Sequence, residues 1–456
     1  MSFPRYSKYK DSGVEWLGEV PEHWRVRRLR LLAELNPSKS EIGHFNRDTQ
    51  VSFLPMEAIG DDGILNLDNE KTIAEVENGY TYFRNGDVTV AKITPCFENG
   101  KGTLMNGLIN GIGFGTTELI VARPNTNEIR GPYLNYLFSS TEFRRLGESY
   151  MYGAGGQKRV PDAFVRNFAV ALPSISEQGR ITTFLDRETA KIDELVGEQR
   201  RLIELLKEKR QAVISHAVTK GLNPHAPMKP SGIEWLGDVP THWEVERLKY
   251  SITKIEQGWS PQCDNEPAVD GEWGVLKVGC GNRDTFDPTE QKALPLDLVP
   301  LPEYEIKTGD ILMSRGNTRD LVGMATLVKE VRPRLLLCDL LYRFRARQER
   351  VESQYLVFSL RSANVRFQVE REATGTSASM KKIGQGTIQE FVICLPPLAE
   401  QRVVIASINA ETAKLDVLTA EAQRAIDLLQ ERRTALISAA VTGKIDVRGL
   451  AESEAA

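Results

Sequence analysis

The sequence contains two copies of one pattern, and this repeat limits the possible fold more than any other feature. Residues 12–24 (SGVEWLGEVPEHW) match residues 231–243 (SGIEWLGDVPTHW), and residues 177–219 match residues 400–442 without a gap. Each copy spans nearly half of the chain, which is too long for a solenoid repeat. The chain is therefore predicted to be a duplicated module.

The two copies differ between these matched segments. Residues from about 30 to 150 and from about 249 to 372 share no obvious local similarity, and short apolar runs such as residues 119–121 and 275–278 indicate strands separated by loops. We predict an α+β fold in which two mixed α/β regions alternate with two long helices. The predicted divisions are residues 1–172 (first globular region with an N-terminal frame segment), 173–221 (central helix), 222–395 (second globular region), 396–443 (distal helix) and 444–456 (tail).

Each matched segment that follows a divergent region has the pattern of one long helix. Apolar residues recur at alternating three- and four-residue steps or at whole heptads, which predicts a coiled-coil seam. Residues 174–177 resemble a capping box, Pro396 and Pro397 can start the second helix, and Gly221 and Gly443 can end the two helices. The predicted seam residues are Leu185, Ile192, Leu195, Leu202, Leu206, Val213, Ile408, Leu415, Leu418, Leu429 and Leu436.

Two such helices in a duplicated chain are expected to pair antiparallel about a pseudo-twofold axis. About 43 residues at ~1.5 Å per residue give a rod of roughly 65 Å. The globular regions are then predicted to lie at opposite ends of the rod, which would fix the distance between them.

A second apolar stripe accompanies the seam on both helices. One antiparallel pair does not need a stripe of that width. Either these residues pack against the globular regions of the chain itself, or they form a docking face for helices of a partner protein. The residues of the second stripe are Ile203, Leu205, Ile214, Ile426, Leu428 and Ile437.

The composition narrows the class of protein. The net charge at pH 7 is −4, so any positive surface for nucleic acid must be local or supplied by partners. The five cysteines are scattered without a C-x-x-C pair, which indicates free thiols rather than a zinc site or a disulfide framework. No apolar run of about 18 residues and no apolar signal core occur, so we expect no membrane span and a cytoplasmic protein.

Polar and basic loops follow predicted strands in both divergent regions. Arginine and lysine pair with guanine edges or phosphates, and asparagine can pair with adenine, so these loops are candidates for DNA contact. Small residues followed by two cations near the end of each region suggest that backbone approaches a phosphate there. Solvated surface loops are the alternative interpretation. The candidate DNA-binding residues are Lys92, Thr94, Asn99, Lys101, Lys158, Arg159, Ser314, Arg315, Asn317, Arg319, Lys381 and Lys382.

Two further sets of side chains are open to more than one interpretation. Arg343, Arg345 and Arg347 alternate on a strand-like run and would face one side, either toward phosphates or as a solvent-facing strand edge. His23 and His242 stand beside Trp24 and Trp243 and are expected to pack against them.

The sequence lacks the common motifs of catalytic sites. The sequence contains no G-x-x-x-x-G-K-[ST] phosphate loop, no G-x-G-x-x-G cofactor turn, no G-x-S-x-G elbow and no H-E-x-x-H helix. We therefore expect no catalytic residue and no metal site in this chain.

Taken together, the repeated features resemble the specificity subunit of Type I restriction–modification enzymes. The resemblance rests on the paired G-[VI]-E-W-L-G-[ED]-V-P-x-H-W segments at residues 13–24 and 232–243. It also rests on the L-P-x-x-x-E-Q helix openings at residues 172–178 and 395–401, and on the E-T-A-K-[IL]-D helices. It covers residues from about 8 to 447.

This resemblance implies a function that composition and spacing do not provide. Each globular region would be a target recognition domain that reads one half of a bipartite double-stranded DNA sequence, and the helices would set the spacer between the halves. Two modification subunits, which bind S-adenosylmethionine and methylate adenine, would dock on the frame. Restriction subunits, which use ATP and Mg²⁺, would join for cleavage. A structural coiled-coil adaptor and the recognition part of a fused methyltransferase or nuclease are the alternatives.

Overall fold

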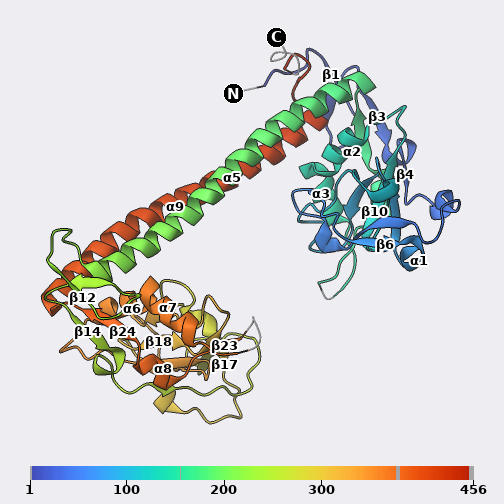
Figure 1. Ribbon diagram of the computed structural model, residues 1–456. Helices are drawn as coiled ribbons and strands as arrows, with labels where there is room; N and C mark the ends of the chain where they lie inside the picture. Colours follow the sequence, from blue (N-terminus) through green and yellow to red (C-terminus); the bar gives the residue numbers. More distant parts are fainter. Residues whose placement is uncertain (1–2, 155, 376–379, 451–456) are drawn as a thin grey trace. The chain divides into compact units, whose positions relative to one another are not determined.

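The computed structural model describes residues 3–154, 156–375 and 380–450. They form two compact units: unit 1 comprises Met1–Arg200 and Gln423–Ala456, and unit 2 comprises Arg201–Ala422. Each unit contains one β-rich globular domain together with one part of each of the two long helices (Figure 1). The α+β fold predicted from the sequence is confirmed.

The tryptophan-bearing segments form the same small frame in both units. An antiparallel strand pair precedes the buried tryptophan, and a second pair joins the strand after the tryptophan to the strand that leads into the long helix. Trp24 and Trp243 are both fully buried. The pairs in unit 1 are β1 (Tyr9–Asp11) with β2 (Glu19–Pro21) and β3 (Arg25–Arg28) with β11 (Ala169–Leu172). The pairs in unit 2 are β12 (Met228–Pro230) with β13 (Asp238–Pro240) and β14 (Glu244–Arg247) with β24 (Val392–Leu395).

The globular domain of unit 1 is built on two sheets. An antiparallel sheet has the order β4-β10-β8, and a four-stranded sheet has the order β6-β5-β9-β7, in which β5 and β9 are parallel. The strands are β4 (Ala33–Leu35), β5 (Gln50–Leu54), β6 (Glu70–Thr72), β7 (Thr81–Arg84), β8 (Val88–Ala91), β9 (Ile112–Gly115) and β10 (Leu119–Pro124). The short helix α1 (Ile73–Val76) follows β6.

The globular domain of unit 2 has a closely similar plan. An antiparallel sheet has the order β15-β22-β18-β20, and a second sheet has the order β17-β16-β21, in which β16 and β21 are parallel. The strands are β15 (Glu256–Gln257), β16 (Gly274–Leu276), β17 (Gln291–Ala293), β18 (Ile311–Ser314), β20 (Ala325–Leu327), β21 (Leu335–Leu336) and β22 (Leu341–Phe344).

The two domains therefore share a topology although their sequences show no obvious similarity. The chain order and direction of β4, β5, β6, β8, β9 and β10 recur in β15, β16, β17, β18, β21 and β22. An ion pair to a buried aspartate recurs with them: Arg123 Nε lies 2.7 Å from Asp87 Oδ1, and Arg345 Nε lies 2.6 Å from Asp310 Oδ1. The divergent regions thus share these six strands and differ in their remaining strands, in their loops and in their side chains.

Helices complete each domain beside the sheets. Unit 1 contains α2 (Gly131–Phe138), α3 (Thr141–Ser149) and α4 (Asp162–Asn167), and unit 2 contains α6 (Ser353–Arg361), α7 (Ala363–Glu372) and α8 (Gln385–Gln389). The long helices are α5 (Ile175–Lys220) and α9 (Leu398–Val441). Gly221 (φ 77°) and Gly443 (φ 75°) adopt the left-handed conformation just after them, as a glycine stop requires.

The E-Q helix openings hold the frame together through their glutamate side chains. Glu177 accepts hydrogen bonds from the Trp24 indole at 3.1 Å and the Tyr6 hydroxyl at 2.9 Å, and its second oxygen lies 3.0 Å from His23 Nε2. In unit 2, Glu400 makes the same contacts with Trp243 at 3.1 Å and with His242 at 2.7 Å.

These contacts correct two sequence-based interpretations. Ser174 Oγ does accept the Glu177 backbone N–H at 3.3 Å, but the Glu177 carboxylate serves the frame instead of completing a capping box. His23 and His242 bind a carboxylate rather than only packing against tryptophan.

α5 and α9 pack together and run antiparallel within each unit (Figure 1). In unit 1, Asp193 of α5 lies 3.0 Å from Arg433 of α9. In unit 2, Arg210 of α5 pairs with Asp416 of α9. The two ion pairs are repeat equivalents, because the gapless match of residues 177–219 with residues 400–442 aligns position 193 with 416 and position 210 with 433.

The buried face of the helices differs in part from the predicted seam. Leu195, Leu202 and Leu418 are 41–46% exposed, so the prediction that they form the seam is wrong. The buried positions recur with a regular heptad spacing that those leucines do not follow, and Thr189 and Val196 take their places. The remaining predicted seam residues are buried (Leu185, Ile192, Leu206, Ile408, Leu415 and Leu436) or partly buried (Val213 and Leu429).

The second apolar stripe is mostly used by the chain itself. Ile214 belongs to the core of unit 2 and Ile437 to the core of unit 1, while Ile426 is buried and Ile203 partly buried on the helix face. These four isoleucines are therefore not a docking face. Leu205 and Leu428, which are repeat equivalents, are 51% and 59% exposed.

Candidate nucleic-acid interface

Two of the predicted basic segments lie side by side in unit 1. The backbone N–H of Thr94 donates to the carbonyl of Lys158 at 3.0 Å, and the N–H of Val160 donates to the carbonyl of Lys92 at 2.8 Å. An isolated bridge joins Ile93 and Arg159. Residues 92–94, which follow β8, therefore carry their cation beside the Lys158 and Arg159 segment, and we call Lys92, Lys158 and Arg159 the first basic cluster.

Unit 2 brings its two predicted segments together in the same way. β19 (Gly316–Asn317) follows β18 and pairs antiparallel with β23 (Lys381–Lys382). The N–H of Ile383 also donates to the carbonyl of Arg315 at 2.9 Å. Arg315, Lys381 and Lys382 thus form a second basic cluster.

The two basic clusters occupy equivalent positions in the repeat. At the same spacing that relates residues 177–219 to residues 400–442, Lys92 corresponds to Arg315, and Lys158 and Arg159 correspond to Lys381 and Lys382. All of these residues were predicted from the sequence as DNA-binding candidates. The sequence did not predict that the loop after the strand lies next to the pair of cations at 158–159 or 381–382. That juxtaposition depends on long-range strand pairing, which local patterns do not specify.

The cations of the two clusters differ in how freely they can meet a ligand. Lys158 and Lys382 are exposed, and Lys92 is partly buried. Arg159 is held by Glu118 through hydrogen bonds of 2.8 and 2.9 Å, and this guanidinium keeps the pKa of the Glu118 carboxyl below its usual range. Lys381 donates to the carbonyl of Gly375 at 2.5 Å.

Arg315 is also engaged, but only weakly. Its guanidinium lies 3.4 Å from the carbonyl oxygen and 4.0 Å from a carboxylate oxygen of Asp339. Both contacts are at the long limit for their type, so a phosphate or a guanine edge could replace them.

Three predicted DNA-binding side chains are committed to the fold instead. Ser314 is buried, donates to the carbonyl of Leu321 and accepts from the N–H of Met324 at 3.2 Å. Asn317 is also buried and donates to Asn282 at 3.0 Å, and Lys101 donates to the carbonyl of Met56 at 3.2 Å. The sequence of a polar loop does not show which side chains turn inward. The prediction that Ser314, Asn317 and Lys101 bind DNA is therefore wrong, because these side chains bond within the fold.

The remaining predicted residues lie on the loops next to the clusters. Asn99 is exposed, and the Thr94 hydroxyl donates to Glu98 at 3.2 Å. The Arg319 side chain is 71% exposed, with one contact of 3.3 Å to Glu370. These three residues stay candidates for DNA contact. The small-residue stretch that precedes Lys381 falls on residues 376–379, and Gly155 of its counterpart is likewise outside the described residues.

The three alternating arginines of unit 2 have internal partners. Arg343 binds Glu256 at 2.5 Å, Arg345 pairs with the buried Asp310, and Arg347 donates to the carbonyl of Ile252 at 2.9 Å. These contacts stabilise the sheet. They favour neither of the two sequence-based interpretations, in which the arginines face phosphates or form a solvent-facing strand edge.

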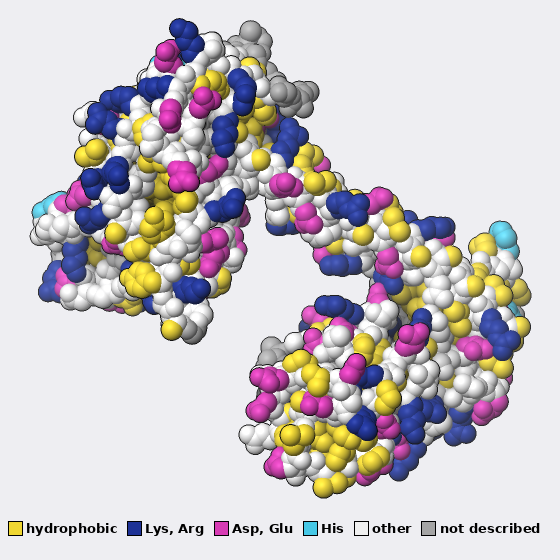
Figure 2. All heavy atoms as spheres, turned by 180° about the vertical axis from the view of Figure 1, so that it is seen from behind, with side chains coloured by type: hydrophobic (Ala, Val, Ile, Leu, Met, Phe, Trp, Pro, Cys, Tyr) yellow, Lys and Arg dark blue, Asp and Glu magenta, His cyan; other side chains and the backbone are white. Residues whose placement is uncertain are grey.

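The surface around the clusters is mixed in charge. On the face shown in Figure 2, lysine and arginine side chains alternate with aspartate and glutamate over both domains. The net charge of the whole chain is −4, so the protein as a whole does not attract nucleic acid. Any electrostatic attraction to nucleic acid must therefore act locally.

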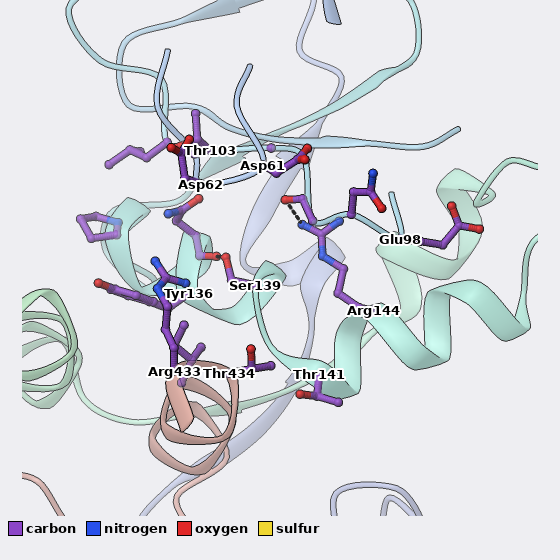
Figure 3. A pocket seen from close by; sticks show the side chains of 18 of the residues that line it. Asp61, Asp62, Glu98, Thr103, Tyr136, Ser139, Thr141, Arg144, Arg433 and Thr434 are labelled. Carbon is purple, nitrogen blue, oxygen red and sulfur yellow. Dashed lines mark hydrogen bonds between the residues drawn. The ribbon is translucent and has the colours of Figure 1, made fainter. Parts of the chain in front are cut away.

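A cavity of about 670 Å³ lies behind the loop of residues 94–100 in unit 1 (Figure 3). Its walls come from that loop, from α2 and α3, and from the α5 and α9 segments of the same unit. Charged side chains of both signs line it, among them Asp61, Asp62, Arg144 and Arg433. Within residues 3–154, 156–375 and 380–450, no group of three or more histidine, cysteine or acidic side chains is arranged to hold a metal ion.

Two arginines next to these loops, the buried Arg144 and the partly buried Arg366, were not predicted from the sequence. Arg144 of α3 and Arg366 of α7 each stand four residues after a serine that caps the helix. The signal in the sequence was a pair of S-x-x-x-R patterns, at residues 140–144 and 362–366. No described helix is long and apolar enough to cross a membrane.

Comparison with known proteins finds similarity to one family of proteins. The family described as "Type I restriction modification DNA specificity domain" matches residues 21–205. The Type I restriction enzyme EcoEI specificity subunit of Escherichia coli is 30% identical over 498 residues, which cover 93% of this chain and 83% of that protein. The EcoAI specificity subunit of Escherichia coli is 42% identical over 189 residues, which cover 41% of this chain and 31% of that protein.

A solved structure extends the likeness to the fold. A chain from work on complex assembly and conformational transition of the type I R-M system superposes with a TM-score of 0.69. The superposition covers 92% of this chain and 98% of that chain, at 19% sequence identity. At this identity the likeness supports the fold alone.

Proposed function

The chain belongs to the specificity subunits of Type I restriction–modification enzymes, and from this membership we propose that each of its two units reads one half of a bipartite DNA sequence. As a member of this family, the chain is the non-catalytic DNA specificity component of its complex. The observation that carries the proposal is the pair of basic clusters, which stand at equivalent positions on topologically equivalent domains but differ in their side chains.

Equivalent backbones with different side chains suit two readers with different targets. A shared scaffold lets both domains approach DNA in the same way, with cations such as Lys158 and Lys382 on phosphates. Differences such as Lys92 against Arg315 then alter the base contacts, because arginine can bind guanine through two hydrogen bonds. The two halves of the target are therefore expected to differ in sequence.

The long helices are proposed to set the spacer between the two half-sites. α5 and α9 are single helices of 46 and 44 residues, and neither is interrupted where the units meet in the sequence. At ~1.5 Å per residue each extends over roughly 65–70 Å. The proposal includes the predicted placement of the two domains at opposite ends of the pair.

The spacer role can be tested by lengthening the helices. One heptad inserted after Glu188 of α5 and one after the repeat-equivalent Glu411 of α9 would lengthen the pair by about 10 Å and keep its heptad register at both ends. We expect the preferred spacer to grow by about three base pairs, at ~3.4 Å per pair. A heptad in α5 alone is the control and should abolish binding. An unchanged spacer in the double insertion would contradict the spacer role.

Docking of two modification subunits is proposed on the exposed leucines of the helices. Unit 1 presents Leu195 and Leu428, and unit 2 presents their repeat equivalents Leu418 and Leu205, all 44–59% exposed. Two equal apolar sites suit two copies of one partner. S-adenosylmethionine would bind to those modification subunits. ATP and Mg²⁺ would bind to restriction subunits that join for cleavage, and the complex would act in the cytoplasm.

DNA reading can be separated from a purely structural role by a binding experiment. The chain, assembled with its modification subunits, is mixed with randomised duplex DNA, and the bound fraction is sequenced. We expect enrichment of one bipartite motif with a fixed spacer. Binding without any enriched motif would favour the structural coiled-coil adaptor and would overturn the proposal.

A further inference from the structure

Arg144 in unit 1 grips the loop that follows the first basic cluster. It lies on α3, is 9% exposed, and donates from Nη1 to the carbonyl of Phe97 and from Nη2 to the carbonyl of Gly100, both at 2.9 Å. Figure 3 shows the side chain pointing from α3 to this loop. The loop includes exposed Asn99 and begins beside Lys92, so the arginine supports the candidate DNA surface from behind.

Unit 2 contains the same arrangement. Arg366 on α7 donates from Nη1 to the carbonyl of Val322 and from Nη2 to the carbonyl of Arg319 at 3.1 Å. In both units the two acceptors are carbonyls three residues apart, on the loop that follows the basic cluster. The loop of unit 2 exposes the Arg319 side chain.

The helix that carries each arginine is fixed to the long-helix segments of its own unit. In unit 1 the N–H of Thr141, at the start of α3, donates to Ser438 Oγ of α9 at 2.9 Å. In unit 2 the N–H of Ala363, at the start of α7, donates to Ser215 Oγ of α5 at 2.8 Å. Each unit thus has a continuous set of contacts from the long helices through one short helix and one arginine to the loop.

A buried guanidinium is an unusual choice for simple support of a loop. Among the described residues, no carboxylate lies within ion-pair distance of Arg144 and its Nε has no acceptor, and burial lowers the pKa of its guanidinium to about 10. Burial likewise lowers the pKa of Arg366. Desolvation of a cation is costly, and stacking of Arg144 4.9 Å over the Phe97 ring and two carbonyl bonds offset only part of that cost. What arginine adds is a rigid fork that fixes two carbonyls at once.

We propose that Arg144 and Arg366 are positioning residues for DNA reading, each holding the loop of its own unit in the conformation that discriminates one half-site. The inference rests on the proposed function, in which each unit reads one half of the target. Neither arginine touches DNA in this proposal; each acts through the backbone of its loop.

The test uses the chain assembled with its modification subunits and compares Arg144→Lys with Arg366→Lys. Lysine keeps the charge but cannot hold two carbonyls in a fixed fork. Methylation or binding is measured on duplexes that carry single base-pair changes in either half-site. We expect Arg144→Lys to reduce discrimination at one half-site by about tenfold and to leave the other within about twofold. Arg366→Lys should give the opposite pattern.

Two controls separate positioning from loss of folding and from direct contact. Discrimination is a ratio, so it does not depend on the fraction of folded protein, and Arg145→Lys at the adjacent exposed position should leave both half-sites unchanged. The dependence of binding on salt should also keep its slope in both variants, because no phosphate contact is lost.

Three results would overturn the inference. They are unchanged discrimination in both variants, equal loss at both half-sites from one variant, and a salt slope lower by about one, which would indicate direct phosphate contact. If the wild-type complex itself ignores changes in both half-sites, the proposed function fails together with the inference. A wild-type complex that discriminates beside variants that match it would overturn the inference alone.

Discussion

Unit 1 and unit 2 are alike where they are buried and different where they are exposed. Both use a carboxylate to hold a tryptophan, both pair an arginine with a buried aspartate in the main sheet, and both hold a loop with an arginine from behind. The clusters on the surface instead carry different cations in part, such as Lys92 and Arg315. The two units therefore share the bonds that build each domain and differ in the side chains of the basic clusters.

The two copies of the frame also differ in how deeply the central carboxylate is buried. The side chain of Glu177 is 6% exposed and that of Glu400 is 32% exposed. Glu177 gains the Tyr6 hydroxyl from the N-terminal segment, and Arg448 of the C-terminal segment lies 4.0 Å away. Unit 1 thus uses both terminal segments of the described chain to close its frame.

The largest effect is expected when the two frame carboxylates are removed in turn. Glu177→Ala leaves the buried donors of Trp24 and Tyr6 without an acceptor and should lower the free energy of unfolding by about 3 kcal/mol. Glu400→Ala should lower it by only about 1 kcal/mol, because water can reach the site. Chemical denaturation, followed separately for each unit by its tryptophan fluorescence, gives both values. Equal losses would contradict the ranking by burial.

A smaller effect is expected at the basic clusters. Arg315→Ala should weaken recognition of one half-site by about 1–3 kcal/mol if the arginine contacts a base, and Lys92→Ala should act on the other half-site only. Binding to duplexes with one altered half-site measures each effect. Lys382→Ala is a useful comparison, since loss of a phosphate contact should weaken binding to all sequences alike. Equal loss at both half-sites from Arg315→Ala would count against its proposed role.

The smallest effect is expected from the equivalent ion pairs between the long helices. Asp193 and Arg433 have side chains that are 55% and 30% exposed, so solvent screens their attraction. A double-mutant cycle on Asp193→Ala and Arg433→Ala should give a coupling of about 0.5 kcal/mol, and the pair of Arg210 with Asp416 should give a similar value. Coupling above about 2 kcal/mol in one pair only would show that the helix pair is less symmetric than its register suggests.

The sequence predicted the repeat, the two long helices and the α+β class because these depend on local patterns. The heptad seam was assigned partly to the wrong face, because Leu195 and Leu202 are apolar and lie one residue away from the buried Val196 and the partly buried Ile203. Burial of Thr189 in the seam shows that the packed face need not be the most apolar one.

The candidate site was predictable in its residue types but not in its geometry. Lys92 and Lys158 are far apart in the sequence, and only strand pairing brings their segments together. Ser314 and Asn317 looked like DNA ligands because polarity in a loop does not reveal which side chains turn inward. Arg144 and Arg366 were not predicted, because the sequence does not distinguish an arginine that turns inward from an arginine on the surface.

We propose that two different readers in one chain recognise a two-part target. The most direct test is single-molecule sequencing of methylated adenine in host DNA, with the wild-type gene, without it, and with the Arg315→Ala variant. We expect one bipartite motif that disappears with the gene, and a variant motif relaxed in one half only. Methylation that does not change when the gene is removed, or a motif relaxed in both halves by the variant, would contradict it.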